Sequence, residues 1–212
     1  MTIRLHRGDL PDLAHYITAP SRAVAIDTET MGLDLQRDRL CVVQLSPGDD
    51  SADVVQIPPH AQNSSDSAPN LKKLLTDPSI LKIFHFARFD LGVLYKAFGV
   101  MPAPVYCTKI ASRLTRTYTD KHGLKDLVRE ILGQEISKQQ QSSDWGAAEL
   151  SDAQVAYAAA DVTHLHALKT RLDAMLAREG REALADACFK FLPERTRLDL
   201  AGFAAEDIFA HS

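Results

Sequence analysis

Two acids, Asp27 and Glu29, stand two residues apart in the segment AIDTETMGLD and follow the apolar run AVAI. If that run is a strand, positions i and i+2 point to the same face, so the two carboxylates project together. Carboxylates this close repel one another unless they are protonated, paired or bound to metal. Hard divalent ions such as Mg²⁺ and Mn²⁺ prefer oxygen ligands, which makes the pair a candidate metal site. The alternative is a strand end that carries two solvated acids.

Two further acids occur next to elements that would hold them near a sheet. Asp90 follows the apolar segment LKIFHF and opens an expected helix, and Asp161 lies in the alanine-rich segment AYAAAD. Tyr157 stands four residues before Asp161, so the two share one face of a helix. Alanine side chains let a helix lie close against a sheet, and an acid buried there is either paired or functional.

In this order, these segments resemble the DEDD family of 3′–5′ exonucleases, tyrosine subtype. Asp27-Thr28-Glu29 matches the first motif, residues 85–90 (HFARFD) match the second, and residues 157–161 (YAAAD) match the third. Residues 138–145 (KQQQSSDW) resemble ribonuclease D. The chain as a whole looks like the compact ribonuclease D relatives called nano-RNase C, which lack the helical HRDC domains.

The resemblance implies a ribonuclease H-like fold with a mixed central sheet flanked by helices, and a 3′–5′ exoribonuclease activity. It implies that Asp27, Glu29, Asp90 and Asp161 bind two divalent ions, Mg²⁺ or Mn²⁺, and that Tyr157 completes the catalytic set. A phenol has an ordinary pKa of about 10 and is a poor base at neutral pH, so we expect Tyr157 to orient the attacking water. The compact relatives convert very short RNAs, notably dinucleotides, to nucleoside 5′-monophosphates and form ring-like octamers.

Eight residues are candidates for contact with the substrate: Thr30, Met31, Gly32, Leu33, His85, Lys138, Gln141 and Trp145. The first four form the turn that approaches the terminal nucleotide in the family. Leu33 would wedge against a base, and the alternative is a tight turn with Leu33 in the core. Lys138 would meet a phosphate, and the Trp145 indole would either stack on a base or anchor its own loop. For His85, a structural role at the end of a buried strand is the alternative.

Hydrophobic periodicity and turn residues predict the elements that would position these groups. Strands are expected over 22–29, 39–46, 51–57, 81–86 and 105–107. Helices are expected over 71–77 with Asn70 as the cap, 88–98, 108–114, 124–132, 151–179 with Ser151 as the cap, and 181–191 before Pro193. Strands dominate the first half of the chain and helices the second, which favours an α/β domain with a mixed sheet.

The 212 residues suit a single exonuclease domain over residues 1–212. The apolar residues of the tail, 194–212, indicate that it packs on the domain or on a neighbouring subunit. No apolar run is long enough to span a membrane, and three widely spaced cysteines favour reduced thiols in the cytoplasm. The net charge of −4 disfavours a long basic groove, and a dinucleotide needs none because it carries few phosphates.

Two other functions stay open from the sequence. The first is a general 3′–5′ exonuclease that processes longer RNA or DNA, which no residue pattern excludes directly. The second is a catalytically silent nucleic-acid-binding module with the same fold. The presence of all four acids together with Tyr157 disfavours this second function.

Overall fold

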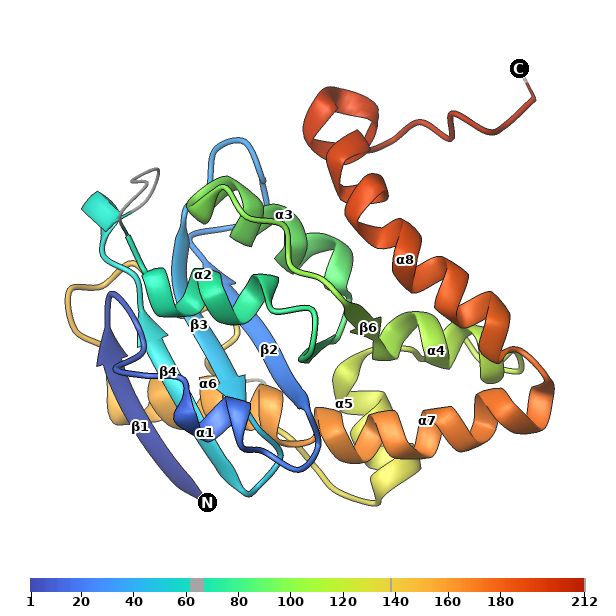
Figure 1. Ribbon diagram of the computed structural model, residues 1–212, viewed down its shortest axis with the longest axis horizontal. Coiled ribbons are helices and arrows are strands. Elements are labelled where there is room, and N and C mark those ends of the chain that lie inside the picture. The colour runs from blue at the N-terminus through green and yellow to red at the C-terminus, as the bar shows by residue number, and fades with distance from the viewer. Residues whose placement is uncertain (62–66, 138, 212) are drawn as a thin grey trace.

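The computed structural model describes residues 1–61, 67–137 and 139–211 and is built on a six-stranded sheet (Figure 1). The strands are β1 (Thr2–Arg7), β2 (Ala23–Thr30), β3 (Leu40–Ser46), β4 (Ser51–Gln56), β5 (Leu81–Phe84) and β6 (Val105–Cys107). Their order across the sheet is β1-β4-β3-β2-β5-β6. Strand β3 is antiparallel to β2 and β4, and the other neighbours are parallel. The expected mixed sheet flanked by helices is confirmed.

Strands β2 and β3 form the centre of the sheet because most of their side chains are apolar and buried. Every residue of β3 is buried, and β2 is buried from Ala23 to Ile26. Both faces of these strands are covered, so they read in the sequence as continuous apolar runs and not as alternating ones. A large polar side chain interrupts the apolar run of β3: Gln44 is fully buried and stands opposite Asp27 on β2.

The sequence expectations miss β1, the edge strand at the N-terminus. Its segment TIRLHR contains only two apolar side chains among charged and polar ones. Strand β1 pairs in parallel with β4, and Arg4 donates from Nε and Nη2 to the Asp53 carboxylate at 2.7 and 2.9 Å. This two-point ion pair joins residues far apart in the chain, and it stabilises a strand that the local pattern leaves weak.

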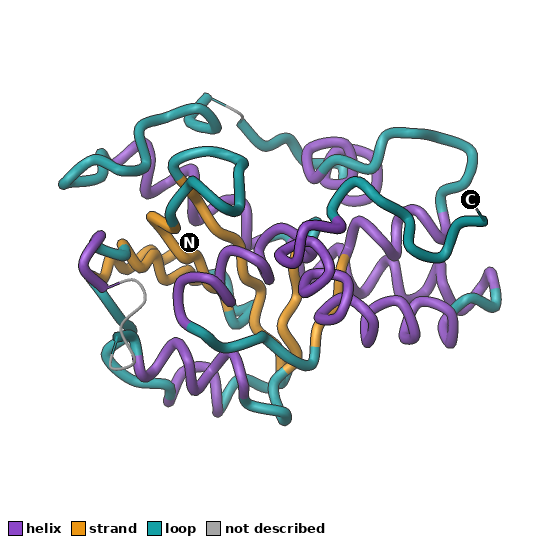
Figure 2. Tube along the Cα trace, turned by 90° about the horizontal axis from the view of Figure 1, so that it is seen from above, coloured by secondary structure: helices purple, strands orange, loops and turns teal. Residues whose placement is uncertain are grey.

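Helices cover both faces of the sheet and extend beyond its β6 edge (Figures 1 and 2). They are α1 (Ala14–Ile17), α2 (Pro69–Thr76), α3 (Ala87–Phe98), α4 (Thr108–Thr115), α5 (Leu124–Leu127), α6 (Asp152–Thr163), α7 (Leu165–Glu179) and α8 (Glu182–Leu198), with a 3₁₀ turn at Pro59–Ala61 and π turns at Val128–Leu132 and Asp199–Phe203. Helices α2 and α3 lie on one face and α6 lies along the other. Beyond β6, α7 packs against α4, and α8 packs against α3. Within the described part of the chain, none of the helices has the length and apolar character needed to cross a membrane.

Two helix boundaries expected in the second half of the chain are wrong. The helix expected over 151–179 is interrupted at His164, which separates α6 on the sheet from α7 against α4. The helix expected to stop at Pro193 continues to Leu198. Proline lacks an N–H donor and weakens a helix, but Thr196 in the following turn is fully buried, and this packing holds the helix in place.

The cap expected for the second helix is also wrong. Helix α2 begins at Pro69, one residue earlier than Asn70, with Ala68 as its N-cap. Proline favours the first helical position because its missing N–H would have no partner there. Asn70 therefore lies inside the helix, and its side-chain amide donates to Leu10 O at 2.8 Å.

The end of the chain leaves the body of the molecule after the Asp199–Phe203 turn (Figure 1). Arg88 forms an ion pair with Asp199 and donates to Ala204 O at 2.9 Å. Residues 201–211 are all exposed. The start of the tail is thus attached to the domain, and the packing expected for the rest of it stays a prediction.

Candidate active site

The acid pair lies beside the point where a neighbouring strand ends. Strand β5 pairs with β2 opposite residues 23–25 and stops at Phe84, two residues earlier than expected. The chain then turns at Phe86, whose φ of +66° lies in the left-handed region, and enters α3. The edge of β2 that carries Asp27 and Glu29 therefore extends past β5, and side chains from both faces of the sheet can meet there.

Asp27 and Glu29 point to the face of the sheet that α6 covers. Helix α6 begins with a capping box at Ser151 and packs on the sheet through buried alanines such as Ala158. This close approach brings Asp161 to the acid pair. One carboxylate oxygen from each of Asp27, Glu29 and Asp161 lies within 4.8 Å of the other two. Three acids from two distant parts of the chain thus share one site.

Asp90 reaches the site from the opposite face. It lies in the first turn of α3, is buried, and accepts a hydrogen bond at Oδ1 from Thr28 Oγ1 at 2.6 Å. Thr28 stands between Asp27 and Glu29, so the alternation of the strand points its side chain away from them and toward α3. Asp90 is outside the group of three acids defined by the 4.8 Å limit, yet its charge acts on both Asp27 and Glu29.

Burial raises the pKa of each of these four acids, and repulsion from neighbouring carboxylates adds to it for Asp27 and Glu29. For Asp27, burial is the largest cause, followed by the charges of Asp90, Asp161 and Glu29, and its pKa lies well above the ordinary value. Burial, with the charges of Asp161 and Asp90, raises the pKa of Glu29 to about 9. Burial raises the pKa of Asp90 and of Asp161 to about 7, although each carboxylate accepts a hydrogen bond that lowers it.

The four carboxylates fit a divalent metal ion. The ion pairs formed between described residues involve none of them. Carboxylates that are largely removed from water and placed close together are costly without a cation, and this cost raises their pKa values. A ligand set made only of oxygen matches hard ions such as Mg²⁺ and Mn²⁺. The structure therefore brings Asp27, Glu29 and Asp161 together as expected, with Asp90 beside them.

Tyr157 lies one turn before Asp161 on α6 and is close to the same acids. It donates a hydrogen bond to the Asp161 carboxylate. Burial, followed by the charges of Asp161, Glu29 and Asp27, holds the pKa of Tyr157 above its ordinary value. The phenol keeps its proton at neutral pH, so it can donate a hydrogen bond in the site but cannot act as a base there.

Two polar neighbours of the acids, Thr28 and Gln44, have no role of their own in the sequence expectations. Gln44 Nε2 donates to Asp27 Oδ2 at 3.5 Å, and its Oε1 is buried without a hydrogen-bond partner in the described part of the structure. A glutamine inside the apolar segment LCVVQLS was the available signal, because a buried amide is expensive unless something needs it. For Thr28, the signal was its position between two acids on one strand.

The turn that follows Glu29 exposes a leucine side chain. Thr30 Oγ1 donates to Gly32 O within the turn, and Leu33 is 85% exposed. The alternative that placed Leu33 in the core is therefore wrong. A Cβ on Gly32 would lie 2.2 Å from Asp38 Oδ2, so any other residue at this position would force the Asp38 side chain to move. The role of this turn in substrate binding stays a prediction.

The segment 139–146 borders the site through Trp145. The indole is buried, and its ring centroid lies 6.0 Å from that of Tyr157. The same segment contacts the turn after β2, because Met31 Cε lies only 3.2 Å from the place of a Cβ on Gly146. This packing favours the loop anchor over the base-stacking platform as the role of Trp145.

Three further residues, His85, Gln141 and Lys138, were expected to contact the substrate. His85 Nδ1 lies 2.9 Å from Thr108 Oγ1, and burial, with the charge of Lys109, lowers the pKa of His85 to about 3. This neutral, bonded ring fits the structural alternative. Gln141 is exposed, and Lys138 lies outside the described residues. The substrate roles of all three stay predictions.

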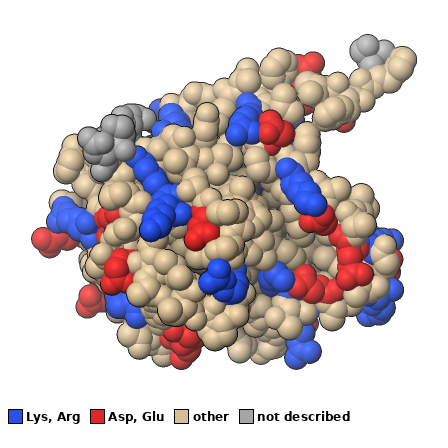
Figure 3. All heavy atoms as spheres, in the orientation of Figure 1, with Lys and Arg blue, Asp and Glu red and all other residues tan. Residues whose placement is uncertain are grey.

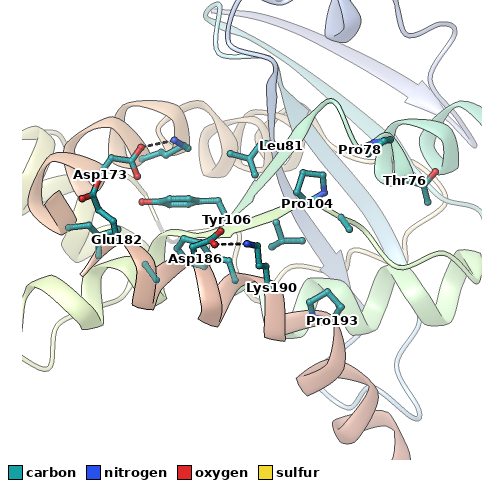
Figure 4. Close-up of a pocket in the computed structure, with 16 residues that line it drawn as sticks. Thr76, Pro78, Leu81, Pro104, Tyr106, Asp173, Glu182, Asp186, Lys190 and Pro193 are labelled. Atoms are coloured by element: carbon teal, nitrogen blue, oxygen red, sulfur yellow. Dashed lines mark hydrogen bonds and ion pairs between the residues drawn. The ribbon is translucent and has the colours of Figure 1, made fainter. Parts of the chain in front are cut away.

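A cavity of about 760 Å³ lies elsewhere in the molecule, between β6, α7 and α8 (Figure 4). Tyr106 lines it, and two ion pairs stand at its sides, Lys169 with Asp173 and Lys190 with Asp186. None of the four clustered acids contributes to this cavity. The chemistry of the chain therefore points to the clustered carboxylates on β2, α3 and α6 and not to this cavity.

Comparisons with known proteins agree with this site. A family described as 3′–5′ exonuclease matches residues 9–177. Ribonuclease D of Gluconacetobacter diazotrophicus is 41% identical over 158 residues, which are 74% of this chain and 39% of that protein. The chain thus spans about two fifths of the length of this curated relative.

Among the solved structures that match over the whole chain are two of the same protein. Brucella melitensis NrnC with bound Mg²⁺ is 61% identical, with a TM-score of 0.93 and 100% coverage of both chains. Brucella melitensis NrnC bound to pGG is 62% identical, with the same TM-score and coverage. One of these similar structures therefore contains a divalent ion and the other a short nucleotide.

Proposed function

Because the chain belongs to the 3′–5′ exonuclease family and has its ribonuclease H-like fold, we propose that it is a metal-dependent exoribonuclease of very short RNAs. The observation that carries the proposal is the group of carboxylates of the half-buried Asp27 and Glu29 and the buried Asp161, with the buried Asp90 next to them. The resemblance to ribonuclease D and its compact relatives, noted from the sequence, is confirmed as a family relation.

In this proposal the four carboxylates hold two divalent ions, Mg²⁺ or Mn²⁺. When bound, such ions make the attacking water more acidic and stabilise the charge on the leaving 3′ oxygen. Mg²⁺ is the ion in one of the similar NrnC structures. Carboxylates bind metal in their ionised form, so the raised pKa values of these four acids imply that metal displaces protons from the site.

Tyr157 orients the attacking water in this proposal. Its phenol stays protonated, so it contributes a directed hydrogen bond and leaves the removal of the proton to other groups. Its bond to Asp161 ties the direction of the phenol to a proposed metal ligand. The products are nucleoside 5′-monophosphates released from the 3′ end.

Two observations support dinucleotides as the main substrate. NrnC, which matches this chain from end to end, was solved with pGG. The chain carries a net charge of −4, and Lys and Arg alternate with Asp and Glu over the face shown in Figure 3 instead of forming a stripe. Proteins that follow a long strand gain affinity from many phosphate contacts along such a stripe. A dinucleotide does not require one.

A general exonuclease that trims longer RNA or DNA is the second candidate. The match to ribonuclease D favours it. Because this chain spans only about two fifths of that protein, the substrates of the longer enzyme do not transfer directly. A catalytically silent module is disfavoured, since all four acids and Tyr157 are present and close together.

We also propose that the protein forms a ring-like homo-octamer and works in the cytoplasm. The assembly is supported by the likeness to the compact relatives and by exposed apolar residues in the tail, such as Ile208 and Phe209. The location is supported by the free thiols of Cys41 and Cys107. Sedimentation velocity on the full chain tests the assembly.

The experiment that tests the function is a length series. Purified protein is given 5′-labelled RNAs, from dinucleotides to strands of about ten nucleotides, with Mg²⁺ or Mn²⁺. We expect the dinucleotide to be consumed fastest and Asp27→Ala to be inactive on every length. Equal or faster trimming of the longer strands would favour the general exonuclease. A wild-type protein that cleaves no RNA with either ion would overturn the proposed function.

A further inference from the structure

Thr28 stands between two proposed metal ligands, but its side chain turns away from both. It lies on β2 between Asp27 and Glu29, and the alternation of the strand directs it to the opposite face. Only 7% of Thr28 is exposed, so its hydroxyl needs a partner within the protein. That partner is Asp90, whose Oδ1 accepts the hydroxyl hydrogen bond at 2.6 Å.

The Asp90 carboxylate lies inside the protein with Thr28 as its side-chain partner. It comes from α3, on the face of the sheet opposite α6, and only 3% of it is exposed. Among the described residues, the Thr28 hydroxyl makes the only side-chain hydrogen bond to the Asp90 carboxylate. The backbone of Thr28 and that of Asp90 itself add hydrogen bonds to the same carboxylate. Thr28 therefore contacts Asp90 through both its side chain and its backbone.

The other three acids come from elements that lie on or face the α6 side of the sheet. Asp27 and Glu29 project from one strand, and Asp161 is placed by the packing of α6 on the sheet. Asp90 comes from α3, on the face of the sheet opposite α6. A rotation about its side-chain bonds would therefore move its carboxylate oxygens away from the other three acids. A short hydrogen bond from a buried hydroxyl to a carboxylate is strong enough to select one rotamer.

We propose that Thr28 is a positioning residue whose hydroxyl holds the Asp90 carboxylate where it completes the metal-binding set built on the α6 face. The inference rests on the proposed metal-dependent function. The strand itself does not require a hydroxyl at this position, since valine has nearly the same shape and also favours strands. The hydroxyl therefore has a task that strand formation does not explain.

Metal binding to the metal-free protein tests this role without relying on turnover. Thr28→Val removes the hydroxyl and keeps the volume, whereas Thr28→Ser keeps the hydroxyl and removes a methyl group. In calorimetric titration with Mn²⁺, we expect affinity to fall about 10- to 100-fold in Thr28→Val, the range found when a residue that orients a metal ligand is removed. Thr28→Ser should stay close to wild type.

Thr115→Val is the matched control. Thr115 is also buried, but its hydroxyl donates to Ala111 O within its own helix, α4. The control should bind Mn²⁺ as wild type does. Thermal unfolding of each metal-free variant separates loss of the fold from loss of the ligand position, and Thr28→Ala provides a second hydroxyl-free variant if Thr28→Val does not fold.

Turnover of a dinucleotide adds a second measurement. In Thr28→Val we expect kcat at fixed Mn²⁺ to fall, to recover in part as Mn²⁺ is raised, and KM for the RNA to stay unchanged. Wild-type Mn²⁺ affinity in Thr28→Val, or equal losses in Thr28→Val and Thr28→Ser, would overturn the inference, because the methyl and not the hydroxyl would then matter. If wild type binds Mn²⁺ but cleaves no RNA, the proposed function fails while the titration still decides the role of Thr28.

Discussion

The ring centroids of Trp145 and Tyr157 lie 6.0 Å apart, and their planes are tilted by 42°. Trp145 is buried, so its indole ring is held in place next to the Tyr157 phenol, to which we assign the orientation of water. Aromatic pairs of this kind contribute about 0.5–1.5 kcal/mol beyond the area that they bury. The contact links the segment 139–146 to the chemistry of α6, although the indole itself does not face solvent.

Replacing Trp145 should therefore affect stability and turnover together. Trp145→Ala is expected to lower the free energy of unfolding by about 3–5 kcal/mol, because it leaves a cavity in the core. It should also lower kcat, since Tyr157 loses the ring that packs against it. Trp145→Phe keeps an aromatic ring, so it should keep most of the free energy of unfolding and most of kcat. Urea unfolding and steady-state kinetics check this. A rise in KM with unchanged unfolding would instead indicate that the indole stacks on a base.

Tyr157→Phe should slow the reaction and leave the metal site intact. The change removes one directed hydrogen bond, and removal of a group that positions protons costs about 100-fold or more in rate. The four carboxylates are untouched, so Mn²⁺ affinity measured by calorimetry should change little. Tyr95→Phe, in a half-buried tyrosine of α3, is the matched control. A kcat equal to wild type in Tyr157→Phe would contradict the assignment.

The clustered acids should make the metal-free protein less stable as pH rises. Their folded pKa values lie above the ordinary ones, so between the two values the native state binds more protons than the unfolded state, and the free energy of unfolding falls with pH. This stabilisation is complete below the unfolded pKa of about 4. It is lost as pH passes the folded pKa of about 7 for Asp90 and Asp161 and of about 9 for Glu29.

Melting temperatures in EDTA from about pH 5 to about pH 9 measure this trend. Saturating Mg²⁺ should raise the melting temperature most at the alkaline end, where the carboxylates are ionised and repel one another. Glu29→Gln should flatten the curve between about pH 7 and about pH 9, because an amide does not titrate. A melting temperature in EDTA that rises over this range would show that the acids are balanced by some other group.

The sequence is informative about this site because its chemistry is concentrated in short motifs. Asp27 and Glu29 share a face by the two-residue period of a strand, and Tyr157 and Asp161 share one by the four-residue spacing of a helix. Both spacings are local, and in the structure these groups lie close together. The mixed sheet was also predictable, because buried central strands read as long apolar runs.

What the sequence did not reveal depends on contacts between distant segments. Strand β1 is held by the ion pair of Arg4 with Asp53, and α8 passes Pro193 because Thr196 is buried. The bond from Thr28 to Asp90 depends on where β5 stops, which no local pattern reports. In each case a tertiary contact overrides or adds to what the residue type alone would predict.

Leu33 offers a direct test of how the terminal nucleotide is held. The side chain is 85% exposed four residues after Glu29, so truncating it should not affect the free energy of unfolding. If Leu33 wedges against a base, Leu33→Ala should raise KM for a dinucleotide by about tenfold, since burying a leucine side chain contributes about 1.5–3 kcal/mol. Mn²⁺ affinity should stay at the wild-type value.

Leu184→Ala is the matched control for this prediction. Leu184 is an exposed leucine near the start of α8, outside the residues that we assign to the site, and its truncation should change neither KM nor unfolding. Kinetics on dinucleotides and on longer RNAs with both variants separate two roles for Leu33. If KM rises only for dinucleotides, the leucine takes part in selecting substrate length. If KM rises equally for RNAs of all lengths, the leucine binds the 3′ base of any substrate. Unchanged kinetics in Leu33→Ala would remove this residue from the substrate contacts.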